Sequence, residues 1–189
     1  MKRTVYLENG KEFSIETGDL LFTKVDAIVN PANSGLSHGA GIAGDISEQA
    51  GPRLDAACEK IINKLGKIQV TQAIPTRAYN LPYKGIIHAV GPRMGNGNEQ
   101  KLLEKTIRNC LYMADRKVFS SIAFPAISTG IFGVPKQICA SSFKNTVPLF
   151  LDKSESIRTV ILCLLENDYP VFEKIFTDSI REVRKGSAN

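Results

Sequence analysis

Several features that mark common classes of protein are missing from this chain of 189 residues. It has two histidines and four cysteines with no C-x-x-C pair, so we expect neither a metal site nor a disulfide scaffold. No apolar run approaches the roughly 20 residues of a membrane span, and the basic N-terminus lacks the apolar segment of a secretory signal. These absences predict an intracellular protein, cytoplasmic or nuclear, with no membrane partner.

Motifs of several enzyme families are missing as well. The chain contains no Walker A sequence and no G-x-S-x-G elbow, and its histidines, His38 and His88, stand fifty positions apart, which gives no support for a catalytic triad. His88 falls inside an apolar strand pattern and is predicted to be a core residue. The cysteines (Cys58, Cys110, Cys139 and Cys163) lie among apolar neighbours, which predicts buried free thiols.

The chain is moderately basic. Its formal net charge is +5 and its sequence pI is about 9.0, a balance that favours anionic partners. The basic residues are scattered, and they do not alternate with aromatic residues as they do on a nucleic-acid platform. A solvated surface is therefore a better interpretation of the charge than RNA binding.

Apolar, β-branched runs alternate with helical patterns along most of the chain. This order predicts the α/β class, with a three-layer α/β/α sandwich around a mixed, largely parallel sheet. We expect a single, monomeric domain over residues 1–185 and a disordered tail at 186–189. The expected strands are 26–30, 85–90, 121–127 and 159–165, with weaker ones at 4–8, 13–17 and 68–74. The expected helices are 42–65, broken at Gly51-Pro52, and 99–117, 135–151 and 169–185.

Two glycine-rich loops follow strands of this predicted sheet. The first, "NPANSGLSHGAGIAG", contains a G-x-G-x-x-G match from Gly39 to Gly44, and the second is "STGIFGVP". A dinucleotide-binding fingerprint would start directly after the strand and be followed about 20 residues later by an acidic residue. Here eight residues separate Asn30 from Gly39, and the following strand ends without a carboxylate. Two such loops instead favour a diphosphate site, because glycines let backbone amides approach phosphates closely.

Three segments, in order and at family spacing, closely resemble the macrodomain family of ADP-ribose-binding α/β/α modules. They are "GDLLFTKVDAIVNPANSGLSHGAGIAG", "HAVGP" and "SIAFPAISTGIFGVP", and the resemblance runs from about Gly18 to Lys185. Within the family, the segments look most like the macrodomains of mono-ADP-ribosyltransferases and of coronaviruses.

The resemblance implies a set of ligand-binding residues and no cofactor. Asp19 matches the residue that accepts a hydrogen bond from the adenine amino group, and Asn33 matches the asparagine that binds the distal ribose. Phe132 would pack against that ribose. The complete implied set is Asp19, Leu20, Asn33, Gly39, Gly41, Ile42, Ala43, Val90, Pro125, Ser128, Thr129, Gly130, Ile131 and Phe132, with Val90 and Pro125 on the adenine side.

The resemblance leaves the chemistry open between three hypotheses. Macrodomain hydrolases of one type carry an aspartate where this chain has Ala43, which favours a non-catalytic reader of ADP-ribose. Coronavirus-like members have alanine there and are associated with hydrolysis, which favours a mono-ADP-ribosyl-protein hydrolase with Asn33 and His38 as its catalytic residues. Asp45, two positions later, is more typical of a helix start. Poly-ADP-ribose or RNA binding is the third hypothesis.

Overall fold

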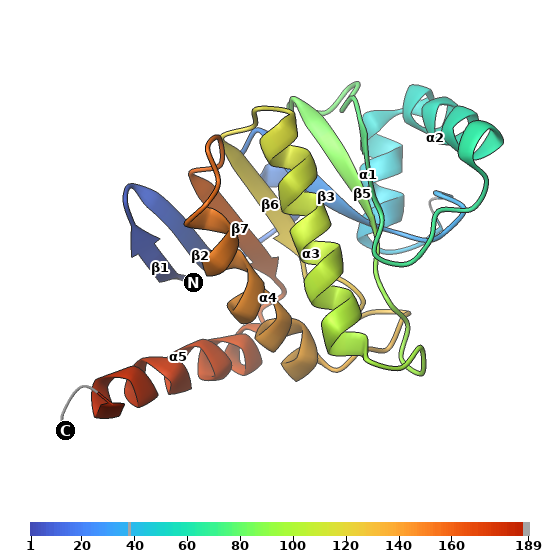
Figure 1. The fold of residues 1–189 in the computed structure, drawn as a ribbon. Helices are drawn as coiled ribbons and strands as arrows, with labels where there is room; N and C mark the ends of the chain where they lie inside the picture. Colours follow the sequence, from blue (N-terminus) through green and yellow to red (C-terminus); the bar gives the residue numbers. More distant parts are fainter. Residues whose placement is uncertain (38, 187–189) are drawn as a thin grey trace.

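The computed structural model describes the backbone of residues 1–37 and 39–186, and the side chains of these residues except Leu7 and residues 178–186. Within this part of the chain, seven strands form one sheet (Figure 1). They are β1 (Lys2–Glu8), β2 (Lys11–Thr17), β3 (Ala27–Ala32), β4 (Ala73–Thr76), β5 (Gly85–Val90), β6 (Ser121–Pro125) and β7 (Thr159–Leu164).

The strand order is β1-β2-β7-β6-β3-β5-β4. The five central strands are parallel, whereas β1 and β4 pair antiparallel at the two edges. The sheet is therefore mixed and largely parallel, as the alternation of apolar strands and helical segments predicts.

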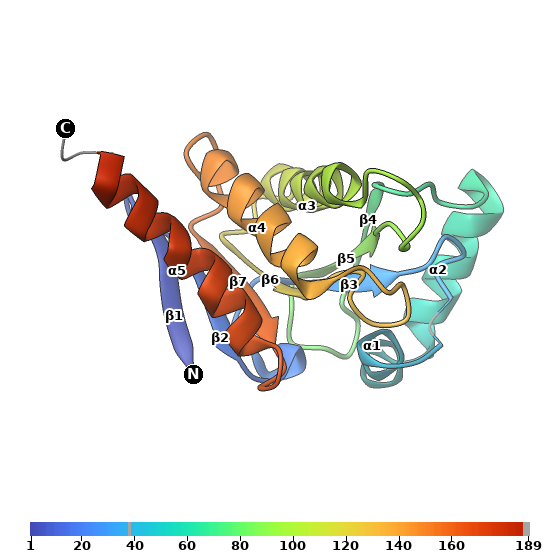
Figure 2. The same ribbon diagram turned by 90° about the horizontal axis from the view of Figure 1, so that it is seen from below.

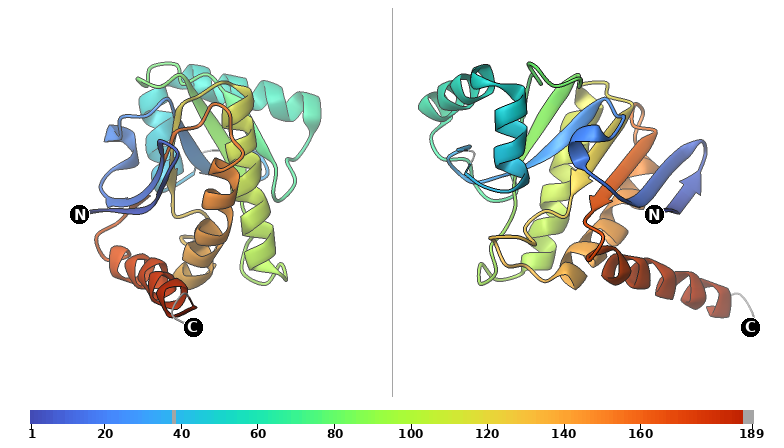
Figure 3. Two further views of the ribbon diagram at one scale, coloured as in Figure 1. Left: turned by 60° about the vertical axis from the view of Figure 1, so that its left-hand side comes forward. Right: turned by 180° about the vertical axis from the view of Figure 1, so that it is seen from behind.

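Helices cover both faces of the sheet. They are the 3-10 helix η1 (Leu20–Phe22) and the α-helices α1 (Ile42–Ala50), α2 (Pro52–Leu65), α3 (Glu99–Arg116), α4 (Lys136–Leu151) and α5 (Tyr169–Gly186). Figure 2 shows α3 and α4 on one face and α1 on the other, which confirms the three-layer sandwich. The β1–β2 hairpin and α2 lie at opposite ends of the molecule (Figure 3). None of the helices in the described part combines the length and apolar character of a membrane span.

The alternation of side chains along each strand divides the core into two layers. In β5, Ile87 and Ala89 join the cluster under α3, α4 and α5, while Ile86 and Val90 join the cluster on the side of α1 and α2. All these side chains are buried. Near-continuous apolar strands are thus explained by a sheet that is covered on both faces.

The Gly51-Pro52 break is confirmed. Gly51 has a φ of +82°, and α2 begins at Pro52. This left-handed backbone angle favours glycine, and a Cβ atom at Gly51 would also push the side-chain nitrogen of Asn80, 2.6 Å away, out of its place.

Several predicted strand boundaries are wrong. The strand predicted at 121–127 ends at Pro125, and the strands predicted at 4–8 and 13–17 begin at Lys2 and Lys11. Strand β3 continues through Pro31 to Ala32. A proline is allowed within this strand because β3 pairs with β6 only at Ala27 and Ile28. Beyond Ile28 no strand pairs with β3 on the side of β6, so the missing N–H of Pro31 costs no hydrogen bond there. Residues 68–72 form no strand, and Thr71 there has a φ of +80°, which breaks extended backbone.

The cysteines and His88 have the predicted environments. All four cysteines are free and buried. The His88 ring is fully buried, with Asn30 Nδ2 at 3.0 Å from its Nδ1 and the Thr76 hydroxyl at 2.9 Å from its Nε2. Of the predicted tail, Gly186 ends α5 and residues 187–189 lie outside the described part.

Candidate functional site

A cavity of about 880 Å³ opens at the carboxyl ends of the parallel strands. It lies where β3 and β6 separate, at the point where the strand order reverses, which is the usual ligand site of open α/β sheets. The ends of five strands and the segments that follow them line it. The lining residues are Thr17–Leu20 at β2; Pro31–Asn33, Ser37, Gly39–Ala43 and Asp45 at β3; Ala89, Gly91 and Arg93 at β5; Pro125–Phe132 at β6; and Cys163–Glu166 with Asp168 at β7.

The first loop, residues 33–41, is held together by the side chain of Asn33. Its Oδ1 accepts hydrogen bonds from the amides of Gly35 (3.0 Å) and Ser37 (3.2 Å), and its Nδ2 donates to the Ser37 carbonyl (2.8 Å) and hydroxyl (3.0 Å). Asn33 therefore has the turn role that asparagine chemistry predicts, and it also lines the cavity. Any change at Asn33 alters both the loop and the cavity wall.

Helix α1 begins at the cavity with an uncapped N-terminus. Gly41 has φ +59° and ψ −153°, and its carbonyl accepts hydrogen bonds from the amides of Gly44 and Asp45. Among the described residues, no acceptor receives the amides of Ile42 and Ala43. Free first-turn amides and the positive end of the helix dipole attract an anion.

The second loop, residues 126–134, presents another group of amides. The Ser128 carbonyl accepts from the Val134 amide (3.0 Å), and the Gly130 carbonyl accepts from the Gly133 amide (2.9 Å). Within the described chain, the amides of residues 130–132 donate to no protein acceptor. Consecutive free amides of this kind form an anion-binding nest opposite the start of α1.

Ser128 adopts an unusual backbone conformation, and its side chain lies against Gly91. Its φ is +68°, and its buried hydroxyl has no partner among the described residues. A Cβ atom at Gly91 would lie 2.3 Å from this hydroxyl and 2.8 Å from Cγ2 of Ile127. Only glycine at the end of β5 therefore allows the second loop to approach so closely.

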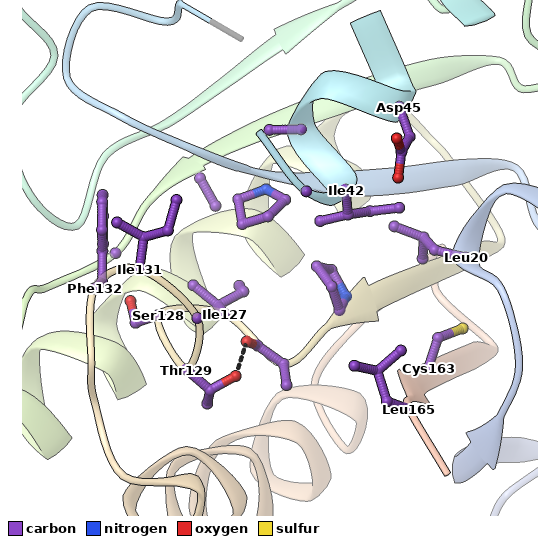
Figure 4. Close-up of a pocket in the computed structure, with 18 of the residues that line it drawn as sticks. Leu20, Ile42, Asp45, Ile127, Ser128, Thr129, Ile131, Phe132, Cys163 and Leu165 are labelled. Carbon is purple, nitrogen blue, oxygen red and sulfur yellow. Dashed lines mark hydrogen bonds between the residues drawn. The ribbon is translucent and has the colours of Figure 1, made fainter. Parts of the chain in front are cut away.

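One end of the cavity is an apolar cleft with acidic groups beside it. Figure 4 shows Leu20, Ile42, Cys163 and Leu165 at this end, with Asp45 projecting from α1 towards them. Burial raises the pKa of Cys163 to about 11, so its thiol is protonated at neutral pH and acts as part of the wall.

Asp19 lies next to this cleft. Its Oδ1 accepts a hydrogen bond from the Leu21 amide (2.8 Å) and caps η1. No hydrogen bond to its other carboxylate oxygen is found among the described residues. Asp19 is exposed and lines the cavity, so this oxygen remains available to a ligand.

At the opposite end stand Phe132 and Ile131 (Figure 4). The guanidinium carbon of Arg93 lies 4.3 Å from the centre of the Phe132 ring. The Met94 amide donates to the Phe132 carbonyl at 2.8 Å, which joins the segment after β5 to the second loop. Arg93 is the one cationic side chain among the described lining residues, whereas Asp19, Asp45, Glu166 and Asp168 are acidic.

The structure brings nearly all of the implied ligand-binding residues to this single cavity. The expectation that Val90 lines it is wrong: Val90 is buried in the core layer under α1 and α2, and its neighbours Ala89 and Gly91 line the cavity. His38 lies outside the described residues. The site residues that the sequence did not indicate include Gly91 and Arg93. Gly91 falls in the matching segment "HAVGP", whereas Arg93 lies just beyond it and no motif pointed to it.

Comparison with known proteins identifies the class. The Macro domain family model matches residues 29–143, which is more than half of the chain, and the protein belongs to this family. It is 45% identical to the O-acetyl-ADP-ribose deacetylase of Salmonella typhimurium over 163 residues, covering 85% of this chain and 91% of that protein.

Solved macrodomains have the same fold. The Oceanobacillus iheyensis macrodomain with ADP has a TM-score of 0.90 at 31% identity, covering 96% of this chain and 98% of that one. The Trypanosoma brucei macrodomain in complex with ADP-ribose has a TM-score of 0.80 at 27% identity, covering 91% and 73%. The family resemblance is therefore confirmed. Its finer part is corrected, because the deacetylase relative is bacterial and not a coronavirus protein or a transferase.

Proposed function

We propose that the protein binds ADP-ribose in this cavity and hydrolyses acyl esters of its distal ribose, releasing ADP-ribose. The observation that carries the binding part is the pair of facing amide groups, at the start of α1 and in the second loop. They are suited to grip a diphosphate from two sides. The solved relatives that contain ADP and ADP-ribose support the same ligand.

In the bound state, the apolar cleft at Leu20 and Leu165 receives the adenine, and Asp19 accepts a hydrogen bond from its amino group. The diphosphate lies between the two loops, and the distal ribose reaches Phe132. This assignment uses the whole length of the cavity. It also agrees with the chemistry of the two ends, because the acidic end meets the amino group of the base and the other end meets the oxygen-rich sugar.

The hydrolytic part is supported by the deacetylase relatives. The substrates would be O-acetyl-ADP-ribose and proteins mono-ADP-ribosylated on acidic side chains, since both are carboxylic esters of the distal ribose. Water would add to the acyl carbon of O-acetyl-ADP-ribose, or to the acyl or the anomeric carbon of the protein ester, and the ester C–O bond would break. The products are a carboxylate, ADP-ribose with a free hydroxyl, and one proton.

Ala43 supports a second candidate, a reader that binds without hydrolysis. In the Oceanobacillus macrodomain, structures exist of variants in which an asparagine and an aspartate ten positions further on are replaced by alanine. Asn33 and Ala43 have the same separation, so this chain lacks a carboxylate at that position. In a hydrolase, a phosphate oxygen of the ligand would then have to position the water.

Turnover and binding, measured side by side, separate the two candidates. Acetate and ADP-ribose would be followed after incubation with O-acetyl-ADP-ribose and with a glutamate-modified protein. Release of product supports the hydrolase, and binding of ADP-ribose without release supports the reader. The binding-deficient control for both assays is Gly130→Val. A Cβ atom at this position meets no protein atom within 4 Å, so the new side chain enters the cavity without disturbing the core. We expect it to abolish binding while the melting temperature stays unchanged.

Replacing Ala43 with aspartate tests the catalytic argument directly. The position lies in the first turn of α1, where a carboxylate is compatible with the helix dipole. A positioned general base contributes about 10²–10⁴-fold to a rate. We therefore expect Ala43→Asp to raise kcat at least about tenfold. An unchanged or lower kcat, with ADP-ribose still bound, would show that water activation in this protein does not depend on that position.

A further inference from the structure

The charges that line the cavity are distributed unevenly along its length. Asp45 and Leu165, which precedes Glu166, lie at the end opposite Phe132 (Figure 4). Arg93, the one cationic side chain among the described lining residues, is at the Phe132 end because its guanidinium stacks on that ring. A ligand therefore meets negative charge at one end and positive charge at the other.

Arg93 is held in place although it is exposed. Its guanidinium lies over the Phe132 ring at 4.3 Å, and the backbone of the next residue, Met94, is bonded to the Phe132 carbonyl. Stacking uses the face of a guanidinium and leaves the N–H donors at its edge available. No acceptor or carboxylate among the described residues occupies these donors.

We propose that Arg93 is a specificity-determining residue for the part of the ligand that extends beyond the second phosphate. This inference rests on the proposed binding of ADP-ribose. A guanidinium carries five N–H donors and no acceptor, which suits the ribose hydroxyls and the carbonyl oxygen of an acyl ester. Phe132 contacts the sugar with its ring and fixes the direction of the donors, so the two side chains act as one unit. The unit favours ligands with an oxygen-rich distal group over ADP, which ends at the second phosphate.

The test compares ADP-ribose with ADP, which lacks the distal ribose and carries one more negative charge on its terminal phosphate. Dissociation constants for ADP and ADP-ribose would be measured by calorimetry with the unmodified protein, Arg93→Met and Arg93→Lys. The control is Lys105→Met, which removes the same charge from the exposed face of α3, away from the cavity. Loss of charged hydrogen bonds predicts about tenfold weaker binding of ADP-ribose to Arg93→Met, with ADP affected less than about twofold. Arg93→Lys should lie between, because it keeps the charge but loses the planar fork.

Equal weakening of both ligands would overturn the proposal, because Arg93 would then act on the phosphates or on the loop as a whole. No weakening of either ligand would overturn it too. Failure of the proposed function gives a different result: an unmodified protein that binds ADP-ribose but releases no product refutes hydrolysis and leaves the Arg93 comparison intact. An unmodified protein that binds ADP but binds ADP-ribose no better refutes the Arg93 proposal, since the distal group would then contribute nothing.

Discussion

Replacing Gly91 with alanine would add a single methyl group where the end of β5 meets the second loop. Gly91 lines the cavity, and the second loop packs closely against it. The new Cβ atom would lie 2.3 Å from the Ser128 hydroxyl and 2.8 Å from Cγ2 of Ile127. Non-bonded carbon atoms pack at about 3.5–4.0 Å, so both contacts overlap by about 1 Å.

Rotation of Ser128 cannot relieve this overlap alone, because Ile127 is buried and blocks the same volume. Both side chains, or the loop segment that carries them, must therefore move. Overpacking of this kind costs about 1–3 kcal/mol, and in a domain of this size each kcal/mol lowers the melting temperature by about 2–4 °C. The displaced segment leads directly to the amides of residues 130–132. We therefore expect Gly91→Ala to weaken ADP-ribose binding by about tenfold or more, equivalent to about 1.4 kcal/mol.

Differential scanning fluorimetry and calorimetry with ADP-ribose check both expectations. The control is Gly44→Ala, the same chemical change in α1, where the nearest protein atom to a Cβ would be 3.6 Å away. It should leave the affinity unchanged and stabilise the helix by about 0.5–1 kcal/mol. If Gly91→Ala melted and bound like the unmodified protein, the reasoning that close approach shapes the second loop would be refuted.

Two further predictions concern stability. Lys11 is buried and donates to the carbonyls of Leu151 and Ser154 at the end of α4, so Lys11→Met should cost about 1–3 kcal/mol in chemical denaturation, and an unchanged midpoint would contradict this role. Burial acts to raise the pKa of Asp26. The ammonium of Lys84 and two donors of Ser120, its amide and its hydroxyl, outweigh this effect and lower the pKa of Asp26 below its ordinary 3.8. A depressed pKa stabilises the folded state above the unfolded value and loses this effect as the pH falls through the folded value. Asp26→Asn should therefore destabilise at pH 7, with a difference that shrinks below about pH 4; a constant difference would exclude the linkage.

The fold could be predicted well because its local signals agree with one another. The buried strands are unbroken apolar runs, and the helices have clear periodicity, so the layer order followed from sequence alone. The wrong strand boundaries occurred where the neighbouring strands, and not the local sequence, decide whether a residue is part of the sheet. Pro31 looks like a strand end, but it is tolerated because β6 has already separated from β3. Thr71 and its neighbours have strand-like composition, yet their backbone turns.

The two loops could be predicted because both are glycine-rich and follow strands of the sheet, and glycines let backbone amides approach a phosphate closely. Gly91 and Arg93 could not be found in this way. Gly91 is required by a residue 37 positions away, Ser128, and Arg93 enters the cavity because Phe132 provides a surface for it. Such requirements exist only between segments that the fold brings together. Val90 does not line the cavity because it is buried in the core, although it lies in the same core layer as the lining residues Leu20, Ala32 and Cys163.

The groups that face the proposed diphosphate are main-chain amides, and this has a consequence for inhibition and for evolution. An amide is present whatever side chain a codon specifies, so few single substitutions can remove a donor. A compound that competes for these amides would therefore leave the protein few escape routes by simple point mutation. A side chain beside these amides can change, as Ala43 shows, without removing the amide of its own residue. The catalytic groups of the pocket can therefore change while its binding of the anion persists.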